Sequence, residues 1–109
     1  MKNNAMNYEV KVTMIKDEVI SVLEQMVGFN EINSVRMVDL LNKIVKQFMT
    51  KDAVEGGYDL TLTVEEVEAL IAVLYNVCNG NEADNVVLAD KIGEQCRKAM
   101  KEQGHIWSF

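Results

Sequence analysis

The sequence predicts a small, mostly helical α+β domain in which a β-α-α unit occurs twice. Two short stretches alternate apolar and polar residues, as strands with one buried face do. Each stretch is followed by two segments with the apolar spacing of amphipathic helices. The 109 residues include no proline and six glycines, which disfavours an all-β sandwich with many tight turns. We therefore expect two short strands and four helices around one shared core.

These elements form a single domain over residues 1–109. The first β-α-α unit covers residues 8–50, the second covers residues 58–104, and residues 105–109 are an apolar tail. The glycine-containing segment 51–57 is the expected linker between the units. Neither unit is long enough to bury a core alone, so both must share one.

The two units resemble each other in sequence. Residues 8–14 match the residues 50 positions later in the chain, and residues 20–49 match those 51 positions later. Ten of these 37 positions are identical, whereas ordinary composition produces about two or three identities by chance. A tandem duplication explains the match. The alternative is two similar amphipathic patterns without common ancestry.

The first helix of each unit has one apolar face. In the second unit, Thr63 followed by Glu66 fits a capping box, in which each side chain bonds the other's backbone N–H. This helix should therefore start directly after its strand. The residues expected to face the core are Ile15, Val19, Val22, Leu23 and Met26 in the first unit, and Val67, Leu70, Ile71, Leu74 and Val77 in the second.

The second helix of each unit follows a polar loop whose Asn and Asp residues are suited to cap it. Gly104 is the expected C′ residue that ends the last helix. A calcium loop at Asn81, Glu82 and Asp84 is the alternative interpretation of the second loop, but the twelve-residue ligand spacing is absent. The residues expected to face inward are Val38, Leu41, Val45 and Phe48 in the first unit, and Ala89, Ile92, Cys96 and Ala99 in the second.

Two strands are marginal in water and leave backbone groups unpaired at both edges. We expect the strands to pair with each other around a pseudo-twofold axis. A second chain should then extend the sheet or cover the helices, so the sequence predicts a homodimer.

The residue types present argue against a metal site, a cofactor and a catalytic centre. Cys78 and Cys96 lie far apart among apolar residues, which predicts buried free thiols, and His105 is the single histidine. Zinc sites and Cys/His catalysis need several convergent ligands or a positioned base. The first residues lack an apolar signal segment and no apolar run reaches membrane-spanning length, so we expect a cytoplasmic protein without a membrane partner.

Acidic residues are concentrated in the second unit. The formal net charge is −6, but the stretch 52–90 has nine acids and no Lys, Arg or His, so it contributes −9; the rest, with 11 bases and eight acids, contributes +3. Direct binding of nucleic acid is disfavoured because it needs Lys and Arg. An acidic face instead attracts a basic protein surface. The residues expected to contact this partner are Glu55, Asp59, Glu65, Glu68, Tyr75 and Asn76.

The tail carries three large apolar residues, Ile106, Trp107 and Phe109. Such a tail seldom stays in water, so we expect it to fold back over the helices. The alternative is that it buries these residues in another subunit or in a partner.

In size, acidity and lack of catalytic residues, the chain resembles the small phage-borne anti-CRISPR and other anti-defence inhibitors. The stretch 62–70, Leu-Thr-Val-Glu-Glu-Val-Glu-Ala-Leu, is also similar to short phage open reading frames of unknown role. The class has no common motif, so the resemblance covers the chain only at the level of the class. It implies inhibition of a CRISPR effector nuclease, with Glu55, Asp59, Glu65 and Glu68 as phosphate mimics.

Two other functions stay open. One is a homo-oligomeric accessory, regulatory or structural phage protein, in which the acidity serves solubility. The other is a small-ligand-binding module that uses a cleft between the units. An enzyme is disfavoured, because no nucleophile or base converges on paired carboxylates such as Glu65 and Glu68.

Overall fold

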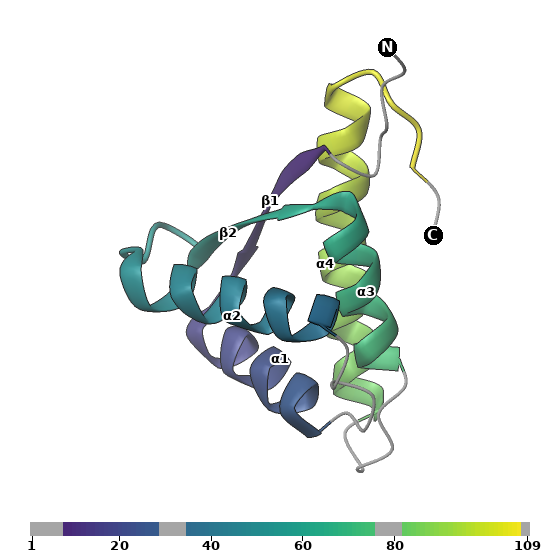
Figure 1. Cartoon of the computed structure of the whole chain (residues 1–109). Coiled ribbons are helices and arrows are strands. Elements are labelled where there is room, and N and C mark those ends of the chain that lie inside the picture. The colour runs from purple at the N-terminus through teal and green to yellow at the C-terminus, as the bar shows by residue number, and fades with distance from the viewer. Residues whose placement is uncertain (1–7, 29–34, 76–81, 108–109) are drawn as a thin grey trace.

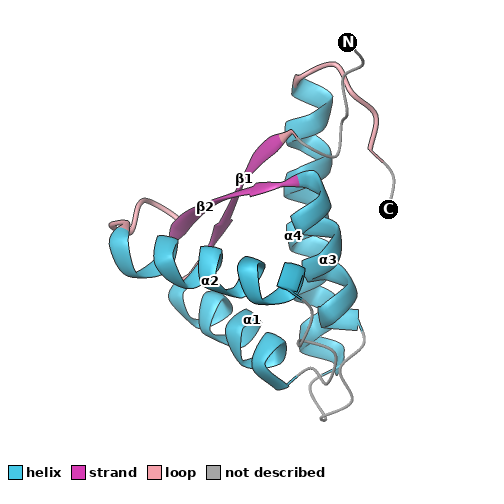
Figure 2. Cartoon of the chain, viewed as in Figure 1, coloured by secondary structure: helices cyan, strands magenta, loops and turns pink. Residues whose placement is uncertain are grey.

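The computed structural model describes residues 8–28, 35–75 and 82–107, without the side chains of residues 35, 36 and 82. Figure 1 shows α1 beside α2 and α3 beside α4, with the two strands crossing between these helix pairs. Figure 2 shows the same view coloured by secondary structure. The predicted α+β class with two strands and four helices is confirmed. The elements in chain order are β1 (Glu9–Met14), α1 (Lys16–Gly28), α2 (Val35–Thr50), β2 (Tyr58–Thr63), α3 (Val64–Tyr75) and α4 (Glu82–Glu102).

β1 and β2 pair with each other as an antiparallel two-stranded ribbon, as the sequence predicts. Val12 lies opposite Leu60 at the middle of the register. One face of the ribbon is buried and apolar, and it consists of Val10, Val12, Met14, Leu60 and Leu62. The other face is polar and partly exposed, and it consists of Glu9, Lys11, Thr13, Asp59, Thr61 and Thr63.

Glutamine side chains from two helices bond the outer edges of the ribbon. Gln95 of α4 accepts the Thr13 N–H at 2.7 Å and donates to the Thr13 carbonyl at 3.0 Å. Gln47 of α2 accepts the Thr61 N–H at 2.8 Å and donates to the Thr61 carbonyl at 3.0 Å. Each amide thus takes the place of a neighbouring strand at one residue. The ribbon therefore does not need a second chain at these two positions, and the homodimer stays a prediction.

The two halves repeat the same interactions at a spacing of 48 residues. Gln47 and Gln95 are 48 apart, and so are their partners Thr61 and Thr13. Two ion pairs repeat at the same spacing: Lys43 Nζ lies 2.7 Å from Glu66, and Lys91 Nζ lies 2.8 Å from Glu18. The two capping carboxylates likewise accept the N–H groups of residues 15 and 63 at 2.9 and 2.8 Å. The halves are therefore related by a pseudo-twofold axis at the centre of the ribbon.

This spacing corrects the spacings of 50 and 51 that the sequence comparison indicates. A shift of two residues is one full period of a strand, so the strand pattern matches equally well at 48 and 50. A shift of three residues is close to one helical turn, so the helix pattern matches similarly at 48 and 51. Only the paired side-chain contacts distinguish these alignments. Common ancestry of the halves stays a prediction.

The core lies between the ribbon and the four helices. The prediction that Val38 and Ile15 belong to this core is wrong. Val38 of α2 is 41% exposed, whereas Leu40 and Ile44 are buried. Apolar residues occur in adjacent pairs along α2, so two neighbouring faces of the helix both have apolar residues at helical spacing. In the structure the buried face is the one that directs Gln47 toward β2. Ile15 is 48% exposed because it precedes α1 at the capping position. Most other expected core residues are buried or half-buried, and Val77 lies outside the described residues.

Local signals at the element ends are confirmed. Glu66 N–H donates to Thr63 Oγ1 at 3.1 Å and the Glu66 carboxylate accepts the Thr63 N–H, which completes the capping box. Gly104 has φ +84°, and its N–H and that of His105 bond the carbonyls of Lys101 and Met100. This is the Schellman pattern of a helix C-terminus.

Replacing either edge glutamine with alanine should destabilise the fold. Gln95→Ala or Gln47→Ala leaves one backbone N–H and one carbonyl without a partner, which costs about 1–2 kcal/mol in each variant. Urea unfolding followed by circular dichroism measures the change. Gln103→Ala, at an exposed position beyond α4, is the matched control and should leave the unfolding free energy unchanged. Equal stability of all three variants would contradict the role of the two amides.

Candidate functional site

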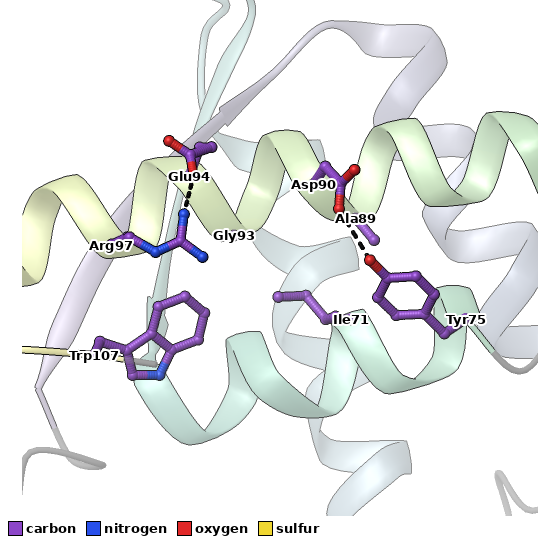
Figure 3. Close-up of a pocket in the computed structure, with 8 residues that line it drawn as sticks. All are labelled: Ile71, Tyr75, Ala89, Asp90, Gly93, Glu94, Arg97 and Trp107. Carbon is purple, nitrogen blue, oxygen red and sulfur yellow. Dashed lines mark hydrogen bonds and ion pairs between the residues drawn. The ribbon is translucent and has the colours of Figure 1, made fainter. Parts of the chain in front are cut away.

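A groove of about 300 Å³ lies between α3 and α4, with the C-terminal tail at one end. Figure 3 shows Trp107 at that end and Tyr75 at the other, with acidic side chains of α4 along the wall. Its lining residues are Ile71, Tyr75, Ala89, Asp90, Gly93, Glu94, Arg97 and Trp107. The α4 members recur every three or four residues, so they share one face of the helix. The groove thus combines two aromatic rings, two carboxylates and one guanidinium.

The tail folds back on its own chain at Trp107. The indole is 7% exposed, and its Nε1–H donates to Glu68 Oε2 of α3 at 2.9 Å. Ile106, by contrast, is 98% exposed.

Desolvation by burial, with the negative charge of Glu68 as a smaller cause, raises the pKa of the buried Cys96 thiol to about 11. Cys96 is therefore protonated at neutral pH and is a poor nucleophile.

Arg97 lies beside the indole and forms an ion pair with Glu94. The guanidinium carbon is 5.8 Å from the centre of the Trp107 ring, within the range of a cation–π contact. The Glu94 carboxylate accepts a hydrogen bond from Arg97 Nη1. One guanidinium is thus held between an aromatic ring and a carboxylate at the tail end of the groove.

At the opposite end, the Tyr75 hydroxyl donates to Asp90 Oδ1 at 2.9 Å. The Tyr75 side chain is 51% exposed although it is aromatic. The hydrogen bond to Asp90 is the largest cause that raises the pKa of Tyr75 above its usual value of 10.0, followed by desolvation and by the charge of Asp90. This end has an aromatic ring and a carboxylate in an accessible position.

The residues expected to contact a partner lie on several different elements. Glu55 precedes β2 by three residues, Asp59 is the second residue of β2, and Glu65 is the second residue of α3. Tyr75 lines the groove, and Glu68 acts through its bond to Trp107. Asn76 and Phe109 lie outside the described residues. The acidic stretch is also partly compensated from the rest of the chain, because Lys43 pairs with Glu66.

The groove depends on residues that differ between the two halves. At the spacing of 48, the first half has larger side chains where the groove has Ala89 and Gly93, and it has Asn42 and Lys46 where the groove has Asp90 and Glu94. The shared scaffold thus carries an open acidic groove in one half. The full set of counterparts of Tyr75, Ala89, Asp90, Gly93, Glu94 and Arg97 is Val27, Leu41, Asn42, Val45, Lys46 and Met49.

Sequence reasoning missed the groove because it compared the halves at the wrong spacing. In the sequence, Asp90 is only the last acid of the stretch 52–90, and Gly93, Glu94 and Arg97 belong to no recognisable motif. An alignment at 48 places glycine against valine and two acids against neutral or basic residues. That contrast is the signal from which the groove could have been found.

The described part of the chain contains no group of three or more His, Cys, Asp or Glu side chains that could hold a metal ion. Asn81 of the alternative calcium loop lies outside that part, as does the side chain of Glu82. Among the described helices, none is long and apolar enough to cross a membrane.

A scan against models of known protein families matches none of them, and searches of curated proteins and of solved structures return no match either. Functional inference therefore depends on the groove and on the ribbon themselves.

Glu68→Ala should release the tail from α3. The variant removes the acceptor of the indole N–H, which destabilises the closed tail by about 1–2 kcal/mol. Because Trp107 is the single tryptophan, its fluorescence reports the change, and we expect a shift of the emission maximum to longer wavelength. Glu102→Ala, an equal charge loss at an exposed position of α4, should leave the spectrum unchanged. Identical spectra of both variants would show that Glu68 does not hold the tail.

The Tyr75 phenol should ionise at higher pH than an unperturbed tyrosine, whose pKa is 10.0. Its raised pKa means that the bond to Asp90 is fully present below pH 10 and is lost as the pH rises through the raised value. NMR of the Tyr75 ring measures this pKa, and Asp90→Asn should lower it toward 10.0. A pKa that is the same with and without Asp90 would contradict the interaction.

Proposed function

We propose that this chain is a non-catalytic interaction protein whose α3/α4 groove binds a basic surface of a partner protein. The observation that carries the proposal is the open groove with Asp90 and Glu94 on its wall, in a half of the molecule whose counterpart has Asn42 and Lys46 there. Negative charge steers a basic partner, and aromatic side chains such as Tyr75 supply the anchoring contacts.

The partner that we propose is a nucleic-acid-binding enzyme. Nucleic-acid-binding enzymes carry basic surfaces, and an acidic protein can occupy their phosphate-binding positions. We propose that the chain is a phage or mobile-element protein that acts in the cytoplasm and inhibits a defence effector such as a CRISPR nuclease. The resemblance to small acidic anti-defence inhibitors supports this choice. The groove, Glu65, and the acids Glu55 and Asp59 are then separate contact sites.

A second candidate function rests on the ribbon. The major groove of DNA admits a two-stranded ribbon, and several proteins read DNA in this way. The polar face here has Lys11 exposed near the pseudo-twofold axis, with the hydroxyl groups of Thr13, Thr61 and Thr63 around it. Against this, Glu9 and Asp59 on the same face repel phosphate, and the net charge is −6. The shape therefore favours duplex binding, whereas the charge favours a basic protein.

One titration series separates the two candidates. A purified CRISPR effector nuclease and a fluorescent DNA duplex are each titrated with the protein at low and at physiological salt, and nuclease cleavage is measured in parallel. The first candidate predicts salt-sensitive binding of the nuclease, loss of cleavage, and about tenfold weaker binding for the double variant Asp90→Asn, Glu94→Gln. The control Asp39→Asn removes an exposed acid of the first half and should bind as the wild type does.

The second candidate predicts binding of the duplex and its loss in Lys11→Ala, with no effect of the groove variant. Nuclease binding that is insensitive to both groove substitutions would overturn the first candidate. Self-association without binding of either probe would favour the homo-oligomeric accessory protein.

A further inference from the structure

We propose that the Tyr75–Asp90 end of the groove is a receptor for a single arginine side chain of the partner. This inference rests on the proposed function and names the group that the groove recognises. Three observations carry it: the chain's own Arg97 at the other end, the accessible carboxylate of Asp90, and a glycine at position 93 of α4.

Arg97 shows which group suits this groove. Its guanidinium lies over the Trp107 ring and bonds the Glu94 carboxylate, which is one helical turn from Asp90. The Tyr75–Asp90 end presents the same two elements, an aromatic ring and a carboxylate. The phenol hydroxyl occupies Asp90 Oδ1, and a carboxylate has a second oxygen that can accept from another donor. The Tyr75–Asp90 end therefore offers a ring and a carboxylate that could bind a guanidinium. Among the described residues, no guanidinium lines this end of the groove.

Gly93 keeps the floor of the groove open between Asp90 and Arg97. Its φ is not positive, so the backbone does not require glycine there. An added Cβ would lie 3.7 Å from Ile71 Cδ1, which is an ordinary contact, so packing does not require glycine either. Glycine inside a helix is unfavourable relative to alanine, and the first half has Val45 at the corresponding position. Glycine leaves the α4 backbone without a covering side chain at the floor of the groove, as close approach of a ligand would need.

Arginine fits these features better than lysine does. Its planar group bonds a carboxylate with two N–H donors and stacks on an aromatic ring at the same time. A lysine ammonium is a compact charge that is strongly hydrated and cannot stack. Tyr75, Ile71 and Gly93 line the space that this planar group would enter.

The test titrates the full-length, ¹⁵N-labelled protein with N-acetyl-arginine amide and follows the Gly93 amide and the Tyr75 ring by NMR. N-acetyl-lysine amide and the uncharged N-acetyl-citrulline amide are the comparison probes. We expect saturable shifts with arginine, weaker shifts with lysine and none with citrulline. Asp90→Asn should weaken arginine binding about tenfold, since it removes the charge of the acceptor.

Gly93→Ala is the sharper variant because it should stabilise the fold while it weakens binding. Alanine is the better helix former, so the thermal midpoint should rise, and the added methyl group narrows the floor. Asp84→Asn, at an exposed position of α4 outside the groove, is the matched control and should bind arginine as the wild type does.

The outcomes separate this inference from the proposed function. Equal binding of citrulline and arginine, or arginine binding that is unchanged in Asp90→Asn and in Gly93→Ala, overturns the arginine receptor. If the arginine receptor is overturned but nuclease binding depends on Asp90 and Glu94, the proposed function of the groove is retained. Only the proposal that an arginine side chain is the group it binds is then wrong. If no basic protein binds, the proposed function fails although the groove can still take arginine.

Discussion

The structure depends on closing the edges of a ribbon that has only two strands. Each edge presents backbone groups that water or another strand must satisfy, and a lone ribbon is marginal for that reason. Gln47 and Gln95 reach from the second helix of one half to the strand of the other half. These contacts, together with the ion pairs of Lys43 and Lys91, bind the halves to each other. The second helices therefore cannot separate from the ribbon without exposing its edges.

The two halves share the contacts that join them but differ at the α3/α4 groove. Core positions such as Leu40 and Leu88, or Ile44 and Ile92, lie 48 residues apart and have the same buried apolar residue in the two halves. The positions that line the α3/α4 groove differ from their counterparts in size and in charge. The tail adds Trp107 to this half alone, held by Glu68. The differences are thus local, and they coincide with the α3/α4 groove.

Much of the fold could be predicted from the sequence because it is determined locally. The strand alternation, the capping box at Thr63 and the helix end at Gly104 each depend on a few neighbouring residues. The face of α2 could not be predicted, since its adjacent apolar pairs fit two stripes and the contact of Gln47 with β2 decides between them. The groove could not be predicted either, because strand and helix periods hide the difference between a spacing of 48 and spacings of 50 or 51. Charge counting located the acidic half but could not show that Glu66 is paired with Lys43.

In the proposed function, the residues that distinguish the α3/α4 groove from the corresponding positions of the first half bind a basic group of a partner. A triple variant, Asp90→Asn, Gly93→Val and Glu94→Lys, gives three positions of the groove the residues of the first half. Hydrogen exchange at the Thr13 and Thr61 amides reports the ribbon, and calorimetric titration with the basic partner reports the groove. We expect both amides to stay protected while binding is lost. Protected amides together with wild-type affinity would contradict the proposed function.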